Sequence, residues 1–173
     1  MKATSVTWAI LGLVERRPMS GYDLKQTVDR TIRHFWAASY GQIYPELKRL
    51  EEAGWVAAAD DGPRGRKVYR ATTAGKRALV DWLHGEETRV ELRDESLLRL
   101  FFADALPVDE ALGLLRARRE GYAQMLALLQ SLDDGSGEPD PPFIDVVYRW
   151  GLDLCEWGID WCERQERRLR RRR

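Results

Sequence analysis

The sequence predicts a mainly α-helical chain built of two domains. Apolar residues recur at helical spacing through most of its 173 residues, and two short runs within residues 55–72 are the exception, with the composition of a β-hairpin. The charge also changes sign along the chain: residues 1–85 carry a net +5, whereas residues 86–163 carry −11. We therefore expect one domain at residues 1–85 and a second, all-helical domain at residues 86–173.

Composition narrows the classes of protein to which the chain can belong. With 44% hydrophobic residues it can bury a core without disulfides, and its longest apolar run, Trp8–Val14, is far shorter than the roughly 20 residues of a membrane span. The N-terminus has no signal-peptide cleavage site, so we expect a cytoplasmic protein with no membrane partner. Cys155 and Cys162, the only cysteines, do not make a zinc site; apolar packing is expected, with a redox sensor as the alternative.

Two helices are predicted at the N-terminus. Residues 4–15 place apolar side chains on one face, with Trp8 and Leu11 off it, so this short helix has to be covered on more than one side. The next helix begins with Ser20 as its N-cap and Asp23 three residues later, which is the arrangement of a capping box.

The third helix carries the most informative polar pattern. Gly54 is its stop signal, and Ser39 and Gln42 are suited to cap its start. Pro45 leaves two alternatives open: the first turn is irregular, or the regular helix begins at Pro45 itself. In both, four residues stay off the apolar stripe and face a potential partner: Gln42, Tyr44, Lys48 and Arg49.

Residues 55–59 and 67–72 form the predicted hairpin, and the loop between them contains glycine and proline. Three cations lie at or beside its tip: Arg64, Arg66 and Lys67. Thr73 is then expected to cap a fourth helix that runs to Gly85. The first domain is therefore predicted as three helices, a basic hairpin and a helix.

A helix with a polar outer face beside a basic hairpin suits DNA. The major groove admits one α-helix, where Gln can bond to adenine and Arg or Lys to guanine, while cations on a loop neutralise phosphates. The first domain thus has the pattern of a winged helix-turn-helix with a two-stranded β wing. The alternative is a solvated helix beside a surface loop, since helix-turn-helix arrangements also occur without DNA contacts.

Several segments of the first half match a known family in the same order. They are ILGL at 10–13, SGYDL at 20–24, GQIYPELKRLEEAGW at 41–55, GRKVY at 65–69 and TTAG at 72–75, with Pro18 between the first two. Together these segments resemble the PadR family of bacterial transcriptional regulators, over about half of the chain. The resemblance implies a dimeric winged-helix repressor that binds a double-stranded DNA operator.

The resemblance also assigns roles to single residues. It puts Gln42, Tyr44, Lys48 and Arg49 on the recognition helix, Arg64, Arg66 and Lys67 on the wing, and Tyr22 and Lys25 at phosphates beside the second helix. Tyr44 can equally be a packing residue.

The second half is predicted to be helical and to hold two copies of the chain together. One helix is expected at 95–104, and a second is opened by Leu106-Pro107 and runs to Leu132. A loop at 133–142 and a last long helix follow. One apolar stripe of that helix repeats every seven residues: Phe143, Val147, Trp150, Leu154, Trp157 and Trp161. A second stripe lies beside it, and one neighbouring helix does not cover both. We expect a homodimer whose two heads meet half-sites about 34 Å apart; a monomeric bundle is the alternative.

The aromatic residues of this half also predict an effector site. Residues that would stack on a planar hydrophobic compound are Trp150, Trp157, Trp161, Tyr148 and Phe101. The resembled family is associated with phenolic acids and with flat, often cationic, compounds, and Glu156, Asp160 and Glu163 would favour a cation. The alternatives are core packing and a solvated acidic face. Our hypothesis is that the effector changes the angle between the two heads and lowers operator affinity.

Residues 164–173 include seven arginines, and we expect a frayed or disordered end. No phosphate-binding loop, nucleophile elbow or His-Glu-x-x-His helix occurs, so neither a cofactor nor an enzymatic activity is expected. The two competing functions are a thiol redox switch and a protein-binding adaptor without DNA affinity.

Overall fold

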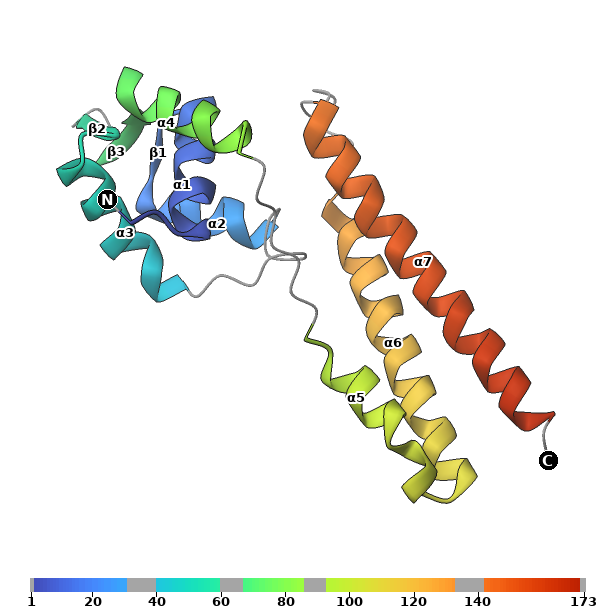
Figure 1. The fold of residues 1–173 in the computed structure, drawn as a ribbon. Helices are drawn as coiled ribbons and strands as arrows, with labels where there is room; N and C mark the ends of the chain where they lie inside the picture. Colours follow the sequence, from blue (N-terminus) through green and yellow to red (C-terminus); the bar gives the residue numbers. More distant parts are fainter. Residues whose placement is uncertain (1, 31–39, 60–66, 86–92, 133–141, 172–173) are drawn as a thin grey trace. The chain divides into compact units, whose positions relative to one another are not determined.

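The computed structural model describes residues 2–30, 40–59, 67–85, 93–132 and 142–171 (Figure 1). By its internal contacts the chain divides into two compact units, Met1–Arg89 and Val90–Arg173. Ser39, the hairpin loop at 60–66 and residues 133–141 of the loop predicted at 133–142 lie outside the described residues, whereas Pro142 already belongs to the last helix.

The first unit is a small sheet covered by helices. Its elements are α1 (Ser5–Arg16), β1 (Met19–Ser20), α2 (Gly21–Arg30), a 3-10 turn (Tyr40–Gln42), α3 (Ile43–Glu52), β2 (Val56–Ala59), β3 (Val68–Ala71) and α4 (Thr73–Leu83). Strand β3 lies between β1 and β2 and is antiparallel to both, with Tyr69 opposite Met19 on one side and Ala58 on the other. The sequence predicted β2 and β3 but missed β1, because a strand of two residues leaves no alternating pattern.

Helix α1 is the centre of the first core. It contacts α3, α4 and β3, and the side chains of Ile10, Leu11 and Val14 are almost completely buried. Trp8, which lies off the main apolar face, stacks between Trp55 and Trp82 with ring centroids 5.7 and 5.3 Å away. The prediction that this helix is covered on more than one side is therefore correct.

Local signals set most of the boundaries in this unit. Ser20 and Asp23 form the predicted capping box: Ser20 N donates to Asp23 Oδ2 at 3.0 Å, and Asp23 N donates to Ser20 Oγ at 3.2 Å. Gly54 follows the end of α3 with φ of +69°, the left-handed conformation that favours glycine. The cap of α4 was predicted one residue late: Thr72, not Thr73, accepts the hydrogen bond from Gly75 N.

The start of α3 decides between the two alternatives left by Pro45. A 3-10 turn occupies Tyr40–Gln42 and the regular helix begins at Ile43, so the irregular first turn is the correct alternative. Pro45 then lies in the first turn of α3, where a backbone N–H has no partner within the helix. Gln42 is at the N-cap position but makes no side-chain cap hydrogen bond.

The second unit is entirely helical. It consists of α5 (Glu95–Phe101), a 3-10 turn (Ala103–Ala105), α6 (Val108–Leu132) and α7 (Pro142–Arg170). Helices α6 and α7 lie side by side along most of their length (Figure 1). Gly158 allows the close approach, because a Cβ there would lie 2.6 Å from the ring of Tyr122. The predicted helix at 95–104 is shorter, with a tighter turn after Phe101.

Helix α7 turns one of its two apolar stripes inward. The buried side chains on it are Cys155 and Cys162, with Gly158 between them, whereas Phe143, Trp150 and Trp157 of the seven-residue stripe are 80%, 54% and 54% exposed. The helix continues to Arg170, so the expectation of a frayed or disordered end is wrong over residues 164–170. Pairs of opposite charge four residues apart, such as Arg170 with Glu166 at 2.6 Å, support this last turn.

Candidate nucleic-acid interface

The polar side of α3 is open. The helix buries Ile43, Leu47 and Leu50 to 2% exposure or less, whereas Gln42 and Lys48 are exposed. The Lys48 side chain is 78% exposed, and its Nζ lies 3.8 Å from Glu52 Oε1. A surface pair at this distance contributes little to stability, so Lys48 can exchange its partner for another anion at low cost.

Tyr44 combines packing with exposure. It is 60% exposed, yet its ring lies so close to Gly21 that a Cβ at that position would be 2.5 Å from Tyr44 Cε1. The tyrosine therefore touches the first residue of α2 and still leaves more than half of its surface open to solvent. The two alternatives for Tyr44, packing and partner contact, are compatible.

The two residues predicted on α2 lie on its exposed side. Tyr22 is 49% exposed, and its hydroxyl accepts a hydrogen bond from Gln26 Nε2 at 2.8 Å. Lys25 is also exposed, and α2 packs against α3 (Figure 1). The two helices that carry these predicted contact residues therefore pack against each other.

Arg49 differs from the other predicted residues of α3. Its Nη1 lies 2.6 Å from Oε2 of Glu46, which is 5% exposed, and its Nη2 donates to the carbonyl oxygen of Lys2 at 2.9 Å. Sequence reasoning missed Glu46 because its position beside the apolar stripe gives no sign that a carboxylate is buried there. The structure thus gives Arg49 an internal partner.

The wing is described only in part. Arg64 and Arg66 lie outside the described residues. Lys67 comes directly before β3; its Nζ lies 3.0 Å from both carboxylate oxygens of Glu51 and 5.6 Å from the Tyr69 ring centroid. The side chain is 52% exposed, so solvent still reaches the charge.

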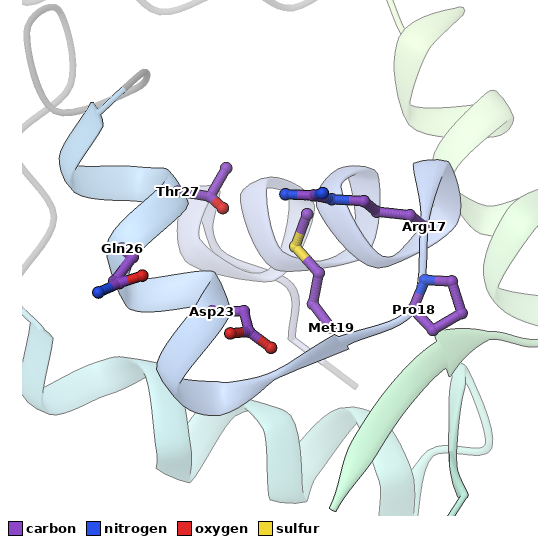
Figure 2. A pocket seen from close by; sticks show the side chains of 6 residues that line it. All are labelled: Arg17, Pro18, Met19, Asp23, Gln26 and Thr27. Carbon is purple, nitrogen blue, oxygen red and sulfur yellow. The ribbon is translucent and has the colours of Figure 1, made fainter. Parts of the chain in front are cut away.

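A hollow between the end of α1 and the start of α2 was not foreseen from the sequence. It has a volume of about 230 Å³ and is lined by Arg17, Pro18, Met19, Asp23, Gln26 and Thr27 (Figure 2). Figure 2 shows the Arg17 side chain extended toward Thr27, above Met19. The rim is polar, and only one of its residues, Met19, belongs to the core.

The five residues predicted to bind an effector have different surroundings. Phe101 is 78% exposed and meets Phe102 edge-on at 5.1 Å between centroids, and Trp157 stacks on Trp161 at 6.2 Å. Tyr148 donates a hydrogen bond to the carbonyl oxygen of Leu129 at 3.2 Å, which ties α7 to α6. Three of the five, Phe101, Trp150 and Trp157, are exposed in the single chain and present aromatic surface to solvent.

Comparison with known proteins identifies the family. The model of the transcriptional regulator PadR-like family matches residues 10–81, and that of the virulence activator alpha C-terminal domain matches residues 92–170. The negative transcriptional regulator PadR of Bacillus subtilis is 34% identical over 127 residues, which are 71% of this chain and 70% of that protein. The chain belongs to the PadR-like family of transcriptional regulators.

Solved structures agree with this assignment over nearly the whole PadR-like chain. Bacillus subtilis PadR in complex with operator DNA is 27% identical, with a TM-score of 0.84 over 96% of this chain and 99% of that one. The same protein in complex with p-coumaric acid is 28% identical, with a TM-score of 0.80 over 95% and 98%. The fold is a winged helix followed by a helical C-terminal domain, and the family consists of regulators rather than enzymes.

The acidic residues near the tryptophans of the PadR-like chain are largely paired. Asp160 forms an ion pair with Arg164, and Glu163 lies 3.6 Å from Arg119 and 3.4 Å from Arg167. Two of the three carboxylates that were expected to favour a cationic effector therefore already have cationic partners. A groove of about 440 Å³ at the end of α7 is lined by Arg164, Arg167, Arg168 and Arg171.

The two cysteines are suited to packing. Both are buried on the side of α7 that faces α6, and neither forms a disulfide. Burial raises the pKa of the Cys155 thiol, and the charge of Glu156 adds to this effect. Burial also raises the pKa of Cys162, although Arg118 and Arg119 act in the opposite direction. The raised pKa values favour the thiol over the reactive thiolate at both positions.

Arg118 organises the start of the second unit, which the sequence did not reveal. Its Nη1 lies 2.7 Å from Asp94 Oδ2, its Nη2 donates to the Tyr122 hydroxyl at 2.7 Å, and Ser96 Oγ is a further partner. Burial would raise the pKa of Asp94, but hydrogen bonds from Ser96, Arg118 and Leu97 N together lower it to about 2. This cluster joins the N-cap of α5 to α6.

No group of His, Cys, Asp or Glu among the described residues is arranged to hold a metal ion. Within the same residues, every helix is too short or too polar to cross a membrane.

Proposed function

We propose that the chain is a homodimeric repressor that binds a two-fold DNA operator in the cytoplasm and leaves it when a small aromatic compound binds the second unit. The observation that carries the proposal is the division of α3 into a buried apolar stripe and an exposed face with Gln42, Tyr44 and Lys48. A helix anchored in this way by its apolar side presents the other side to a major groove.

The proposed contacts follow from side-chain chemistry. Gln42 bonds to the edge of an adenine, Lys48 to a guanine or a phosphate, and the Tyr44 hydroxyl to a phosphate or base edge. Tyr22 and Lys25 contact phosphates beside α2, and the wing residues Lys67, Arg64 and Arg66 contact the backbone next to the recognition helix. The Bacillus subtilis PadR complex with operator DNA supports this proposal.

Dimerisation rests on the exposed stripe of α7. Phe143, Val147, Trp150, Leu154 and Trp157 are between 38% and 80% exposed in the single chain. Their seven-residue repeat is the spacing with which two helices pack along a seam, and burying these side chains would remove a large apolar surface from water. A two-fold dimer then holds two recognition helices for two half-sites about one helical turn, roughly 34 Å, apart.

The effector proposal rests on the aromatic surface. Trp150, Trp157 and Trp161 on α7, with Tyr148 and Phe101, offer ring faces on which a planar compound can stack. The complex of Bacillus subtilis PadR with p-coumaric acid supports an aromatic ligand. Compound binding lowers operator affinity if it favours a dimer arrangement whose recognition helices no longer match the half-site spacing.

Selection from random DNA by the purified protein tests the proposal. We expect the bound sequences to share a two-fold repeat with half-site centres about 10 base pairs apart. Binding to that repeat should weaken steeply with salt, because Lys and Arg contacts release counterions from the DNA. Equal affinity for the selected repeat and for bulk duplex would contradict the proposal.

A further inference from the structure

Glu46 is the only buried charged residue among those that the structure describes. It lies in the first turns of α3 with 5% exposure, opposite the fully buried Thr7 of α1. A carboxylate in such a position is costly unless both of its oxygens have partners. The contacts of its two carboxylate oxygens therefore show how the buried charge is stabilised.

Both oxygens of Glu46 are satisfied. The Thr7 hydroxyl donates to Oε1, and Arg49 Nη1 donates to Oε2 at 2.6 Å. The chain of contacts continues at both ends: Thr7 Oγ1 accepts from Thr4 N at 2.8 Å, and Arg49 Nη2 donates to the Lys2 carbonyl at 2.9 Å. We call Thr7, Glu46 and Arg49 the Glu46 network; it joins the N-terminal segment and α1 to α3.

We propose that the Glu46 network is the positioning device of the recognition helix, and that Arg49 acts through Glu46 rather than by contact with DNA. The inference rests on the proposed function and changes the role expected for Arg49 from its place on α3. Two of the guanidinium's donors are held by internal acceptors. The Glu46 charge also compensates the arginine, so the pair contributes little to counterion release from DNA.

The Glu46 network adds directional contacts that the apolar stripe of α3 lacks. Apolar contacts are non-directional, so Ile43, Leu47 and Leu50 hold α3 against the core without strictly fixing its rotation about its axis. Hydrogen bonds and the ion pair depend on angle as well as distance. Because Glu46 is bonded to α1 on one side and to Arg49 on the other, the direction in which Gln42 and Lys48 point is coupled to the position of α1.

The test uses three variants and the selected operator, with Tm and operator Kd measured over a series of salt concentrations. Arg49→Met leaves a buried carboxylate with only Thr7 as partner, so we expect a lower Tm and an operator affinity weaker by about tenfold, in the middle of the coupling range for residues of one network. Glu46→Gln with Arg49→Met removes the buried charge and keeps an oxygen for Thr7. We expect this double variant to regain most of the Tm and affinity that Arg49→Met loses, because the bond from Thr7 that links α1 to α3 is kept, and to have the salt slope of the wild type.

Thr7→Val provides an independent measurement, since it removes one bond of the network and leaves Arg49 in place. We expect weaker operator binding with an unchanged salt slope. Lys48→Met is the matched control for a residue that does contact DNA. We expect its Tm to stay at the wild-type value and its plot of log affinity against log salt to become less steep by about 0.9.

Two outcomes overturn the inference while leaving the proposed function intact. One is a double variant with restored Tm but weak binding and a slope reduced by about 0.9, because Arg49 would then be a phosphate contact. The other is wild-type Tm and affinity in Arg49→Met or Thr7→Val. A wild-type protein without preference for any selected sequence overturns the proposed function itself, and the positioning role with it.

Discussion

At the scale of single residues, Gly75 occupies a position at which the fold has no room for a side chain. The glycine lies in the first turn of α4, where a Cβ would be 2.1 Å from the backbone oxygen of Trp55. We expect Gly75→Ala to lower the free energy of unfolding by about 2 kcal/mol or more, because backbone atoms have to move. Urea denaturation measures this change.

Gly12 is the matched control for Gly75. It lies inside α1, where a Cβ would meet nothing within 4 Å. Gly12→Ala is expected to raise the free energy of unfolding by about 0.5–1 kcal/mol, because alanine is the better helix former. Equal effects of the two alanines would show that the contact with Trp55 is not what selects glycine at position 75.

The thiols allow a second prediction at this scale. Because burial raises the pKa of both Cys155 and Cys162, we expect iodoacetamide to modify neither at pH 7 in the folded protein within a time that fully modifies the unfolded chain. Mass spectrometry of the intact protein reports the reaction. Rapid modification of the native protein would revive the redox-switch alternative.

At the scale of an element, Asp94 makes the start of α5 sensitive to acid. Its folded pKa of about 2 lies below the ordinary aspartate value of 3.8, so its stabilising effect is complete above pH 3.8 and is lost as the pH falls through about 2. Asp94→Asn should therefore lower the free energy of unfolding by about 2 kcal/mol at pH 7. The difference between wild type and variant, followed by urea denaturation at decreasing pH, should shrink toward pH 2; a constant difference would exclude the Arg118 pair as its cause.

The sequence predicted the larger elements well because several signals agree in each of them. Ser20 and Asp23 mark the start of α2, Gly54 marks the end of α3, and the apolar periodicity of α6 and α7 leaves no other assignment. The predictions that failed concern segments that are short or that depend on contacts with other residues. Strand β1 exists only because β3 pairs with it, and the last turn of α7 is held by carboxylates four residues earlier.

The candidate interface was predicted less completely than the fold. Exposed residues such as Lys48 follow directly from the period of the helix, since they lie opposite the apolar stripe. Glu46 and Arg118 could not be found in this way, because their partners are distant in sequence or belong to another helix. A burial pattern reveals which side of a helix faces the core, but not which charge is compensated there.

At the scale of the whole molecule, one substitution on α7 can test whether the chain forms the proposed dimer. Trp157→Glu puts a charge into the middle of the exposed stripe of α7, where the tryptophan is 54% exposed in the single chain. We expect sedimentation to show a dimer for the wild type at micromolar concentration and a monomer for the variant, with operator affinity reduced accordingly. Leu128→Glu on α6, which changes a residue 46% exposed outside the stripe, should remain dimeric.

The stack of Trp8, Trp55 and Trp82 has a spectroscopic consequence. Trp8 lies 5.3 Å from Trp82 and 5.7 Å from Trp55 between ring centroids, close enough for their transitions to couple, so the first unit should contribute to the aromatic circular dichroism spectrum. That signal reports the packing of α1 and α4 and is separate in origin from the indoles of α7. Trp8→Phe should remove this contribution. In a titration with an aromatic compound, the tryptophans of α7 would then account for a larger share of the spectral change.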